Sequence, residues 1–266
     1  MATELGGTAV FYWATLVLWS ASLGFEIAVK RRFELSTAVA GVFFFQTANW
    51  AFRYGVSKDP LFVNTAVSLL HSSIVSLSVL VILARQLMVN GLNKMLEHNQ
   101  LFGGTWRGAY ATLCFSCGYF AYDQMDMLVY RLYTGRFPSI LAHHLVLLIC
   151  FTLALYRHVT INYLILTLVC EIHSIFLHTR KLRRMTGIRD AKNGIVKIEW
   201  LLNWASFFAA RLVCHILITC KLIIDSSKFG EGIELPLALF GMAGMNLLNV
   251  FLGIDLFKAY RKEKIQ

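Results

Sequence analysis

Long apolar runs separated by short polar segments dominate this chain. Seven of the runs contain the roughly 20 apolar residues that a helix needs to cross the hydrocarbon core of a bilayer. They cover residues 8–28, 61–84, 107–130, 137–156, 159–179, 196–222 and 235–257. Because only helices and closed barrels span lipid, and these runs are too long for barrel strands, the pattern predicts an all-α, polytopic membrane protein.

An eighth apolar segment, residues 37–52, is shorter and carries Gln46 and Asn49. With seven spans and an outside N-terminus, the basic clusters at 30–32 ("KRR"), 180–184 ("RKLRR") and the tail share one face, as the positive-inside rule requires. Counting 37–52 as a full span would move "KRR" to the opposite face. We therefore expect 37–52 to be interfacial or re-entrant on the cytoplasmic side, and the C-terminus to lie in the cytosol.

Composition and charge support a membrane protein. Of the 266 residues, 57% are hydrophobic and 15% are charged, whereas about one quarter of a soluble domain is charged. The formal net charge of +10 is typical of a cytoplasmic face rich in Lys and Arg, and the chain contains no zinc-finger or RNP motif. We expect membrane lipids as partners and no nucleic acid.

Polar and ionisable side chains recur inside five successive predicted helices. A charge at membrane depth costs several kcal/mol, so such groups normally face the interior of a helix bundle. We therefore expect a common polar cavity, although Asn203 alone could serve a helix–helix hydrogen bond, and Arg211 could pair with Asp123 or Asp126. The residues concerned are His71; Tyr119, Asp123 and Asp126 on one stripe; His143 and His144; Glu171 and His178; and Asn203 and Arg211. His178 lies near a helix end, where water is available, so it is given little functional weight.

His143 and His144 are adjacent in an otherwise apolar stretch, "SILAHHLVLLICFTLAL". Neighbouring helix positions diverge by about 100°. We expect one ring to face the cavity and the other to bond a neighbouring helix. A neutral imidazole near a carboxylate of Asp123, Asp126 or Glu171 can act as a base, a nucleophile or a metal ligand.

Metal chemistry has no spacing signature in this chain. Membrane di-iron enzymes need repeated H-x-x-x-H and H-x-x-H-H boxes, and no H-x-x-x-H is present. A zinc ion on His143 would likewise lack the ligand spacing of known zinc sites. We assign no metal ligands.

Five motifs, in this order, resemble the TLC domain, which is named for the translocation-associated membrane protein, the longevity-assurance ceramide synthases and a ceroid-lipofuscinosis protein. The resemblance covers about residues 61–262. It is closest to the TLC-domain-containing proteins that regulate plasma-membrane phospholipid composition and fluidity. The motifs are "VSLLHSS" at 67–73, "GYFAYDQMDMLV" at 118–129, "LAHHLVLL" at 141–148, "EIHSIFLHTRKL" at 171–182 and "NWASFFAARL" at 203–212.

The resemblance implies a six-helix, barrel-like bundle with a central lipid-binding cavity. Residues 1–60 would add an N-terminal transmembrane helix and the interfacial segment, and residues 263–266 a short tail. The implied catalytic candidates are His143, His144, Asp123 and Glu171. The implied lipid-binding residues are His71, Tyr119, Asp126, Asn203 and Arg211.

The implied function is control of membrane phospholipid acyl composition, and so of fluidity, at the plasma membrane, with the endoplasmic reticulum as the alternative location. The paired aspartates that the ceramide synthases carry after their H-H pair are missing from "ILTLVCEIHSIFLH". Ceramide synthesis is therefore not expected. Another acyl transfer, with acyl-CoA as donor, and a non-enzymatic lipid sensor or trafficking adaptor both stay open. A transporter is disfavoured because no inverted repeat is visible.

Overall fold

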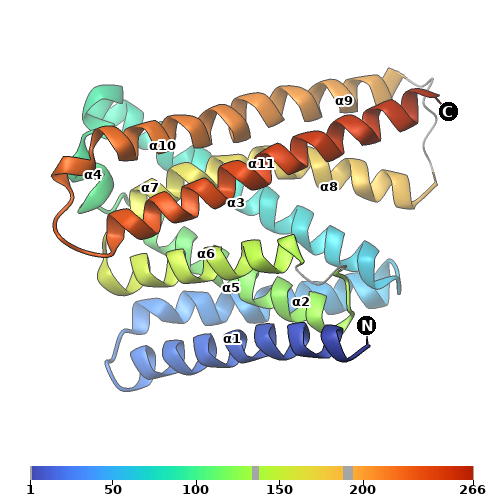
Figure 1. Cartoon of the computed structure of the whole chain (residues 1–266), viewed down its shortest axis with the longest axis horizontal. Coiled ribbons are helices and arrows are strands. Elements are labelled where there is room, and N and C mark those ends of the chain that lie inside the picture. The colour runs from blue at the N-terminus through green and yellow to red at the C-terminus, as the bar shows by residue number, and fades with distance from the viewer. Residues whose placement is uncertain (1, 134–137, 188–193, 266) are drawn as a thin grey trace.

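The computed structural model describes residues 2–133, 138–187 and 194–265, where the chain forms helices and no β-strand, so the predicted all-α fold is confirmed. The long helices lie side by side along one direction (Figure 1). A 3-10 turn, Leu168–Cys170, continues α7 into α8, and a π-helical turn, Phe207–Val213, continues α9 into α10. The helices are α1 (Ala2–Ala28), α2 (Ser36–Gly55), α3 (Pro60–Met95), α4 (His98–Phe102), α5 (Ala109–Val129), α6 (Ser139–Arg157), α7 (Ile161–Thr167), α8 (Glu171–Met185), α9 (Gly194–Ser206), α10 (Cys214–Ile224) and α11 (Glu234–Ile265).

Within the described residues, six helical segments are long and apolar enough to cross a membrane. They overlap six of the seven predicted spans, and the exception is the predicted span 107–130. The segments are Gly6–Ala28, Pro60–Met95, Ser139–Arg157, Ile161–Met185, Gly194–Ile224 and Glu234–Glu263.

The helix over 107–130 exists as α5 but lies in the interior of the bundle. It packs against α1, α2, α3, α6 and α7. From Ser116 to Leu128 all its residues except Met125 are buried. A helix that is surrounded by other helices needs no apolar surface toward lipid, so α5 can carry polar side chains that would be costly on an outer helix.

Contacts between helix ends define two ends of the bundle. At the first, which we call the Arg32 end, the guanidinium of Arg32 donates to the carbonyl oxygens of Leu155 and Tyr156 at the end of α6. At the second, the Arg53 end, the guanidinium of Arg53 lies over the ring of Tyr130, just after α5. In the described chain α1, α2, α3, α5, α6, α7–α8, α9–α10 and α11 each run from one end to the other (Figure 1). Both termini therefore lie at the Arg53 end.

The segment predicted to be interfacial or re-entrant, 37–52, belongs to α2 (Ser36–Gly55), which lies along the whole of α5. Among the described residues, α2 is not one of the six helical segments that are long and apolar enough to cross a membrane, so its position relative to the bilayer stays a prediction. Near the Arg32 end the carbonyl oxygen of Glu34, just before α2, accepts from the thiol of Cys114, and near the Arg53 end the side chain of Asn49 donates to Asp126. Midway, a Cβ on Gly118 would overlap the carbonyl oxygen of Ala38. Small residues thus let the two backbones approach closely, which is how helices associate in lipid.

The path of α2 also separates the basic clusters that the seven-span prediction places on one face. The basic residues 30–32 lie at the Arg32 end, opposite 180–184, and the two termini share one side. The positive charges of residues 30–32 are offset locally. Lys30 pairs with Glu26 at 2.7 Å, and Arg32 pairs with Glu34 at 3.1 Å.

The first 60 residues pack directly on the rest of the bundle. The indole nitrogen of Trp19 donates to Thr152 on α6 at 2.9 Å, and the amide of Gln124 on α5 donates to the Tyr12 carbonyl oxygen at 3.2 Å.

α3 begins at a well-formed cap, where Asp59 accepts from the backbone of Leu61 and proline occupies the first helical position.

Candidate functional site

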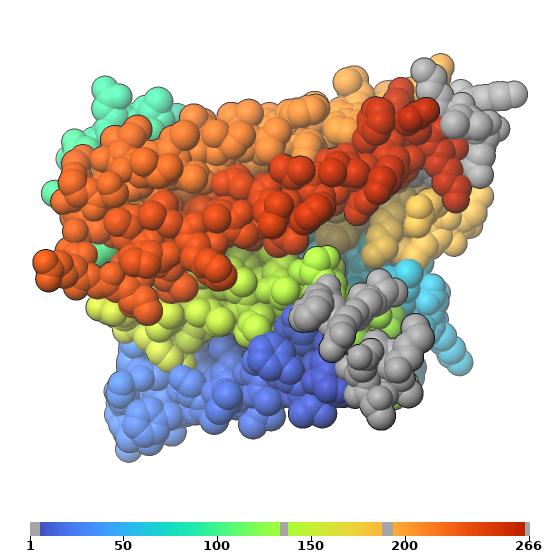
Figure 2. Space-filling model, in the orientation of Figure 1, coloured from blue at the N-terminus to red at the C-terminus, as the bar shows by residue number. Residues whose placement is uncertain are grey.

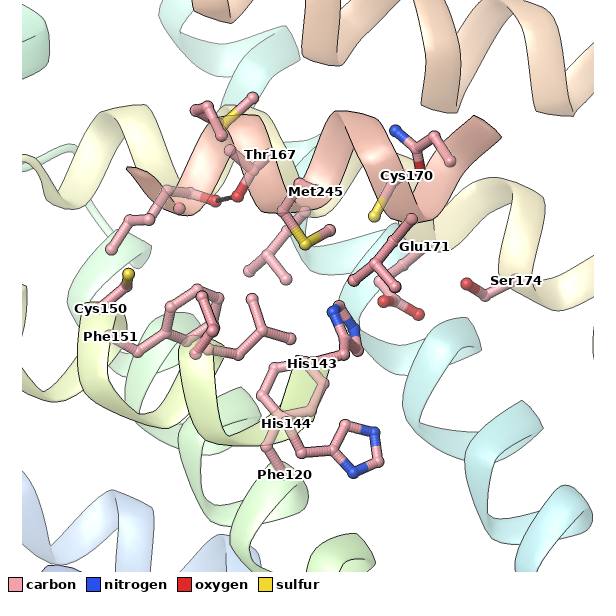
Figure 3. Close-up of a pocket in the computed structure, with 18 of the residues that line it drawn as sticks. Phe120, His143, His144, Cys150, Phe151, Thr167, Cys170, Glu171, Ser174 and Met245 are labelled. Atoms are coloured by element: carbon pink, nitrogen blue, oxygen red, sulfur yellow. Dashed lines mark hydrogen bonds between the residues drawn. The ribbon is translucent and has the colours of Figure 1, made fainter. Parts of the chain in front are cut away.

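An elongated cavity of about 450 Å³ lies between α3, α5, α6, α7–α8, α10 and α11 (Figure 3). Its volume is in the range of small-molecule sites. Its half toward the Arg53 end is polar and its half toward the Arg32 end is mostly apolar, so it suits a ligand with a polar group and a hydrocarbon chain. The polar lining includes Asn64, Ser68, Ser72, Tyr119, Asp123, His143, His144, Glu171, Ser174, His178, Lys181 and Arg211; the apolar lining includes Phe151, Ala154, Leu222, Ala238 and Met242.

His144 is tied to a carboxylate on the neighbouring helix α5. Its Nε2 atom lies 3.3 Å from Oδ2 of Asp123. The other oxygen of Asp123 accepts from the side-chain amide of Asn64 on α3 at 2.6 Å. The amide, carboxylate and imidazole thus form a chain that fixes the orientation of the Asp123 carboxylate and places a hydrogen-bond partner at one nitrogen of His144.

His143 also lines the cavity, but its ring is unpaired. In the described part of the chain it makes no hydrogen bond, and its Nδ1 atom is buried without a partner. In Figure 3 the ring points toward the side of the cavity that carries Glu171, whereas the ring of His144 points away from it. The expected divergence of the two rings is therefore observed, yet both border the cavity. His143 is therefore an imidazole that is free to engage a ligand, and His178 on α8, whose buried Nδ1 also lacks a partner among the described residues, is a second one.

Glu171 begins α8 and faces α3. The hydroxyl of Ser72 donates to its Oε2 atom at 2.6 Å, and Nδ1 of His71 lies 3.8 Å from the same oxygen. The ring of His71 stacks on Tyr119, with ring centroids 3.7 Å apart. These contacts hold a carboxylate at the cavity wall.

Arg211 lies in the π-helical turn between α9 and α10 and lines the cavity. Its guanidinium donates to Nδ1 of His173 at 3.1 Å and to the hydroxyl of Ser174 at 2.8 Å. No carboxylate of the described residues lies within 4 Å of it, so it pairs with neither Asp123 nor Asp126. Neutral partners orient Arg211 and leave its charge available to an anionic group.

Three of the predicted lipid-binding residues lie outside the cavity lining. His71 lies behind Tyr119, and Asp126 accepts from Asn49 and Asn64, each at 3.0 Å. Asn203 donates to the backbone carbonyl oxygens of Phe176 and Glu199. Direct contact of these three with lipid has no support from the geometry, whereas Tyr119 and Arg211 do line the cavity.

Sequence reasoning missed Asn64 and Lys181 and gave little weight to His178. All three line the cavity. The spacing of the polar residues in the sequence of α8 could have identified His178 and Lys181. Glu171, Ser174, His178 and Lys181 follow one another at three or four residues along α8, so they share one helix face.

The site as a whole offers two imidazoles without hydrogen-bond partners among the described residues, an imidazole paired with a carboxylate, a second carboxylate and two cations. Such a set can bind an anionic headgroup and exchange a proton with it. Among the described residues, no three His, Cys, Asp or Glu side chains are placed to hold a metal ion.

Comparisons with known proteins agree with the resemblance of the motifs. Residues 61–258 match the TLC domain. TLC domain-containing protein 2 of Danio rerio is 25% identical over 246 residues, which cover 86% of this chain and 93% of that protein. TLC domain-containing protein 1 of Rattus norvegicus and of Mus musculus are 28% and 27% identical over 110 residues, which cover 41% of this chain and 43% of each. No solved structure gives a significant match.

Proposed function

This chain belongs to the TLC domain family, and we propose that it binds membrane phospholipid through its cavity and thereby controls phospholipid acyl composition and membrane fluidity, at the plasma membrane. The observation that carries the proposal is the unpaired ring of His143 in a cavity that is polar at one end and apolar at the other. A cavity that is apolar throughout would offer no group to bind a lipid headgroup. A cavity that is polar throughout would not accept a hydrocarbon chain.

The polar half supports a specific arrangement of roles. Arg211 binds the phosphate of the lipid, because its guanidinium is oriented by His173 and Ser174 and lacks a carboxylate partner. His143 contacts the ester or hydroxyl region next to that phosphate. Asp123 orients His144, and Glu171 supplies negative charge on the opposite wall.

These groups would also serve an acyl transfer, with an acyl thioester such as acyl-CoA as donor. His143 would remove the proton from a lipid hydroxyl as that oxygen attacks the thioester carbon. The new C–O bond forms as the C–S bond breaks, and the proton passes from the imidazolium to the leaving thiolate. Without this step, the same contacts would make the protein a lipid sensor. His143 would then need only to form a hydrogen bond with the headgroup and would transfer no proton.

Lipidomics of cells that lack the protein and are complemented with variants tests the proposal. We expect His143→Ala to leave the phospholipid acyl profile uncorrected. If His143 transfers a proton, His143→Gln should fail equally, because an amide cannot act as a base near neutral pH. If His143 only binds the headgroup, Gln should restore part of the effect.

His158→Gln is the matched control. His158 is an exposed histidine at the Arg32 end, where its ring contacts Arg32, and it does not line the cavity. It should complement like wild type. A normal acyl profile with both His143→Ala and His143→Gln, at wild-type abundance, would contradict any role of the cavity in the lipid effect.

A further inference from the structure

Three hydrophobic residues of the cavity lining are also part of the outer surface, and two of them, Ile140 and Phe251, face each other across the seam between α6 and α11; the third, Ile233, directly precedes α11. Ile140 on α6 is 47% exposed and Phe251 on α11 is 53% exposed, and both line the cavity. A side chain can meet both conditions only where the cavity reaches the surface. The space-filling view shows this face hollowed between α11 and α6, toward the end where α8 is visible beneath (Figure 2). The cavity therefore opens sideways between α6 and α11.

The other half of the seam between α6 and α11 is closed. A Cβ on Gly241 of α11 would lie only 3.2 Å from the sulfur of Cys150 on α6. Nearer the Arg32 end, Nη2 of Arg157 and Oε1 of Glu234 form an ion pair at 2.6 Å across the same seam. This half of the seam between α6 and α11 is thus closely packed, whereas the opening at Ile140 and Phe251 lies in the half that holds the polar groups.

The outer surface along the seam between α6 and α11 is suited to lipid rather than water. Ile149 on α6 and Leu247 and Ile254 on α11 are exposed hydrophobic residues of helices long enough to span a membrane. A molecule that enters here therefore comes from the bilayer. His143 lies three residues after Ile140, about one turn farther along the same face of α6, so its imidazole lies next to the opening.

The apolar half of the cavity continues from the polar half toward the Arg32 end and is lined by residues such as Ala154, Ala238 and Met242. An acyl chain that enters at the opening can extend along this apolar lining, while the exposed hydrophobic surface beside the opening suits a second chain that stays in the bilayer.

We propose that one acyl chain of a two-chain bilayer phospholipid enters through the opening between Ile140 and Phe251 and extends toward the Arg32 end, while its second chain stays in the bilayer. The inference rests on the proposed function and identifies the ligand as a bilayer phospholipid that is never fully extracted. The closed half of the seam then encloses the end of the inserted chain.

Photo-crosslinking in vesicles tests the inference. The full chain is reconstituted with phosphatidylcholine that carries a diazirine at the end of one acyl chain, and labelled residues are identified by mass spectrometry. We expect labels on the apolar lining, such as Ala154, Ala238 and Met242. Ile140→Trp, which narrows the opening, should abolish these labels, and Phe251→Ala, which widens it, should increase them.

Ile149→Trp is the matched control, since Ile149 is on the same helix and exposed but does not line the cavity. It should leave interior labelling unchanged. Interior labelling that persists in Ile140→Trp, or that arises only from a diazirine acyl-CoA added in water, would overturn the sideways route while leaving lipid binding intact. Absence of interior labelling from both probes in the wild-type chain would instead contradict the proposed function itself.

Discussion

Nε2 of His144 lies 3.3 Å from Oδ2 of Asp123, and this contact separates the roles of the two adjacent histidines. Because His144 already has a carboxylate partner, it is held in one orientation. His143, which has no partner in the described residues, is free to follow a ligand. Two rings that are equivalent in the sequence are therefore unlike in the folded chain.

Replacing Asp123 with Asn should change the lipid effect more than the stability. An amide keeps the volume of the carboxylate and can still accept from Asn64, so the fold should be retained. The negative charge beside His144 is lost, so the contact between residue 123 and the His144 ring becomes weaker. We expect an altered phospholipid acyl profile at near-normal protein abundance. A normal profile at reduced abundance would show that the pair is structural only.

Replacing Asp126 with Asn should have the opposite outcome. Asp126 accepts from both Asn49 and Asn64 and does not line the cavity. An amide there leaves a buried donor without an acceptor, which costs about 1–3 kcal/mol. Thermal unfolding of the purified protein should show reduced stability, with an unchanged acyl profile per molecule of protein. Unaltered stability would contradict the role given to this network.

The path of α2 predicts which parts of the chain share a side of the membrane. Single cysteines at Lys30 and Lys58, in a Cys220→Ser background, should be labelled from opposite sides by a membrane-impermeant reagent. Lys58 should share its side with a tag on the C-terminus, because both follow passes that finish at the Arg53 end. Labelling of Lys30 from the side of the C-terminal tag would restore the seven-span arrangement.

The close approach of α2 and α5 predicts a strong effect at Gly118. Its substitution by Ala would place a methyl group against the Ala38 carbonyl oxygen and 3.0 Å from the Val42 nitrogen. Since backbone atoms cannot yield easily, we expect a loss of about 1–3 kcal/mol in the free energy of unfolding. Gly244→Ala on α11, where nothing lies within 4 Å of the new methyl group, should be neutral or slightly stabilising. Equal stability of the two variants would contradict the packing.

Asp225, which follows α10 at the Arg32 end, predicts a pH dependence. Burial alone would raise the pKa of its carboxyl, but hydrogen bonds from Lys221 and Lys228 outweigh burial and lower the pKa from 3.8 to about 2. The stabilisation by this carboxylate is therefore present above about pH 4 and is lost as the pH falls toward 2. Asp225→Asn should lower the melting temperature at neutral pH, and the difference from wild type should shrink below about pH 4. A difference in melting temperature that does not change with pH would show that the stabilisation does not come from the ionised carboxylate of Asp225.

The sequence by itself determined the all-α class, most of the helical segments and the family. These depend on local properties, namely the length of apolar runs, helical spacing and the order of motifs. It also identified His143, His144, Asp123, Glu171, Tyr119 and Arg211, all of which line the cavity, because ionisable groups at membrane depth need a polar interior.

Only the tertiary structure decided the path of α2, the end of the bundle at which residues 30–32 lie and the division of the polar residues between cavity and wall. Asp123 and Asp126 are one helical turn apart on the same stripe, yet only Asp123 lines the cavity. The difference arises because Asn49 and Asn64, which are 77 and 62 residues from Asp126 in the chain, enclose it. Such contacts depend on how distant helices pack and rotate against one another, and the spacing of residues within one helix carries no information about that.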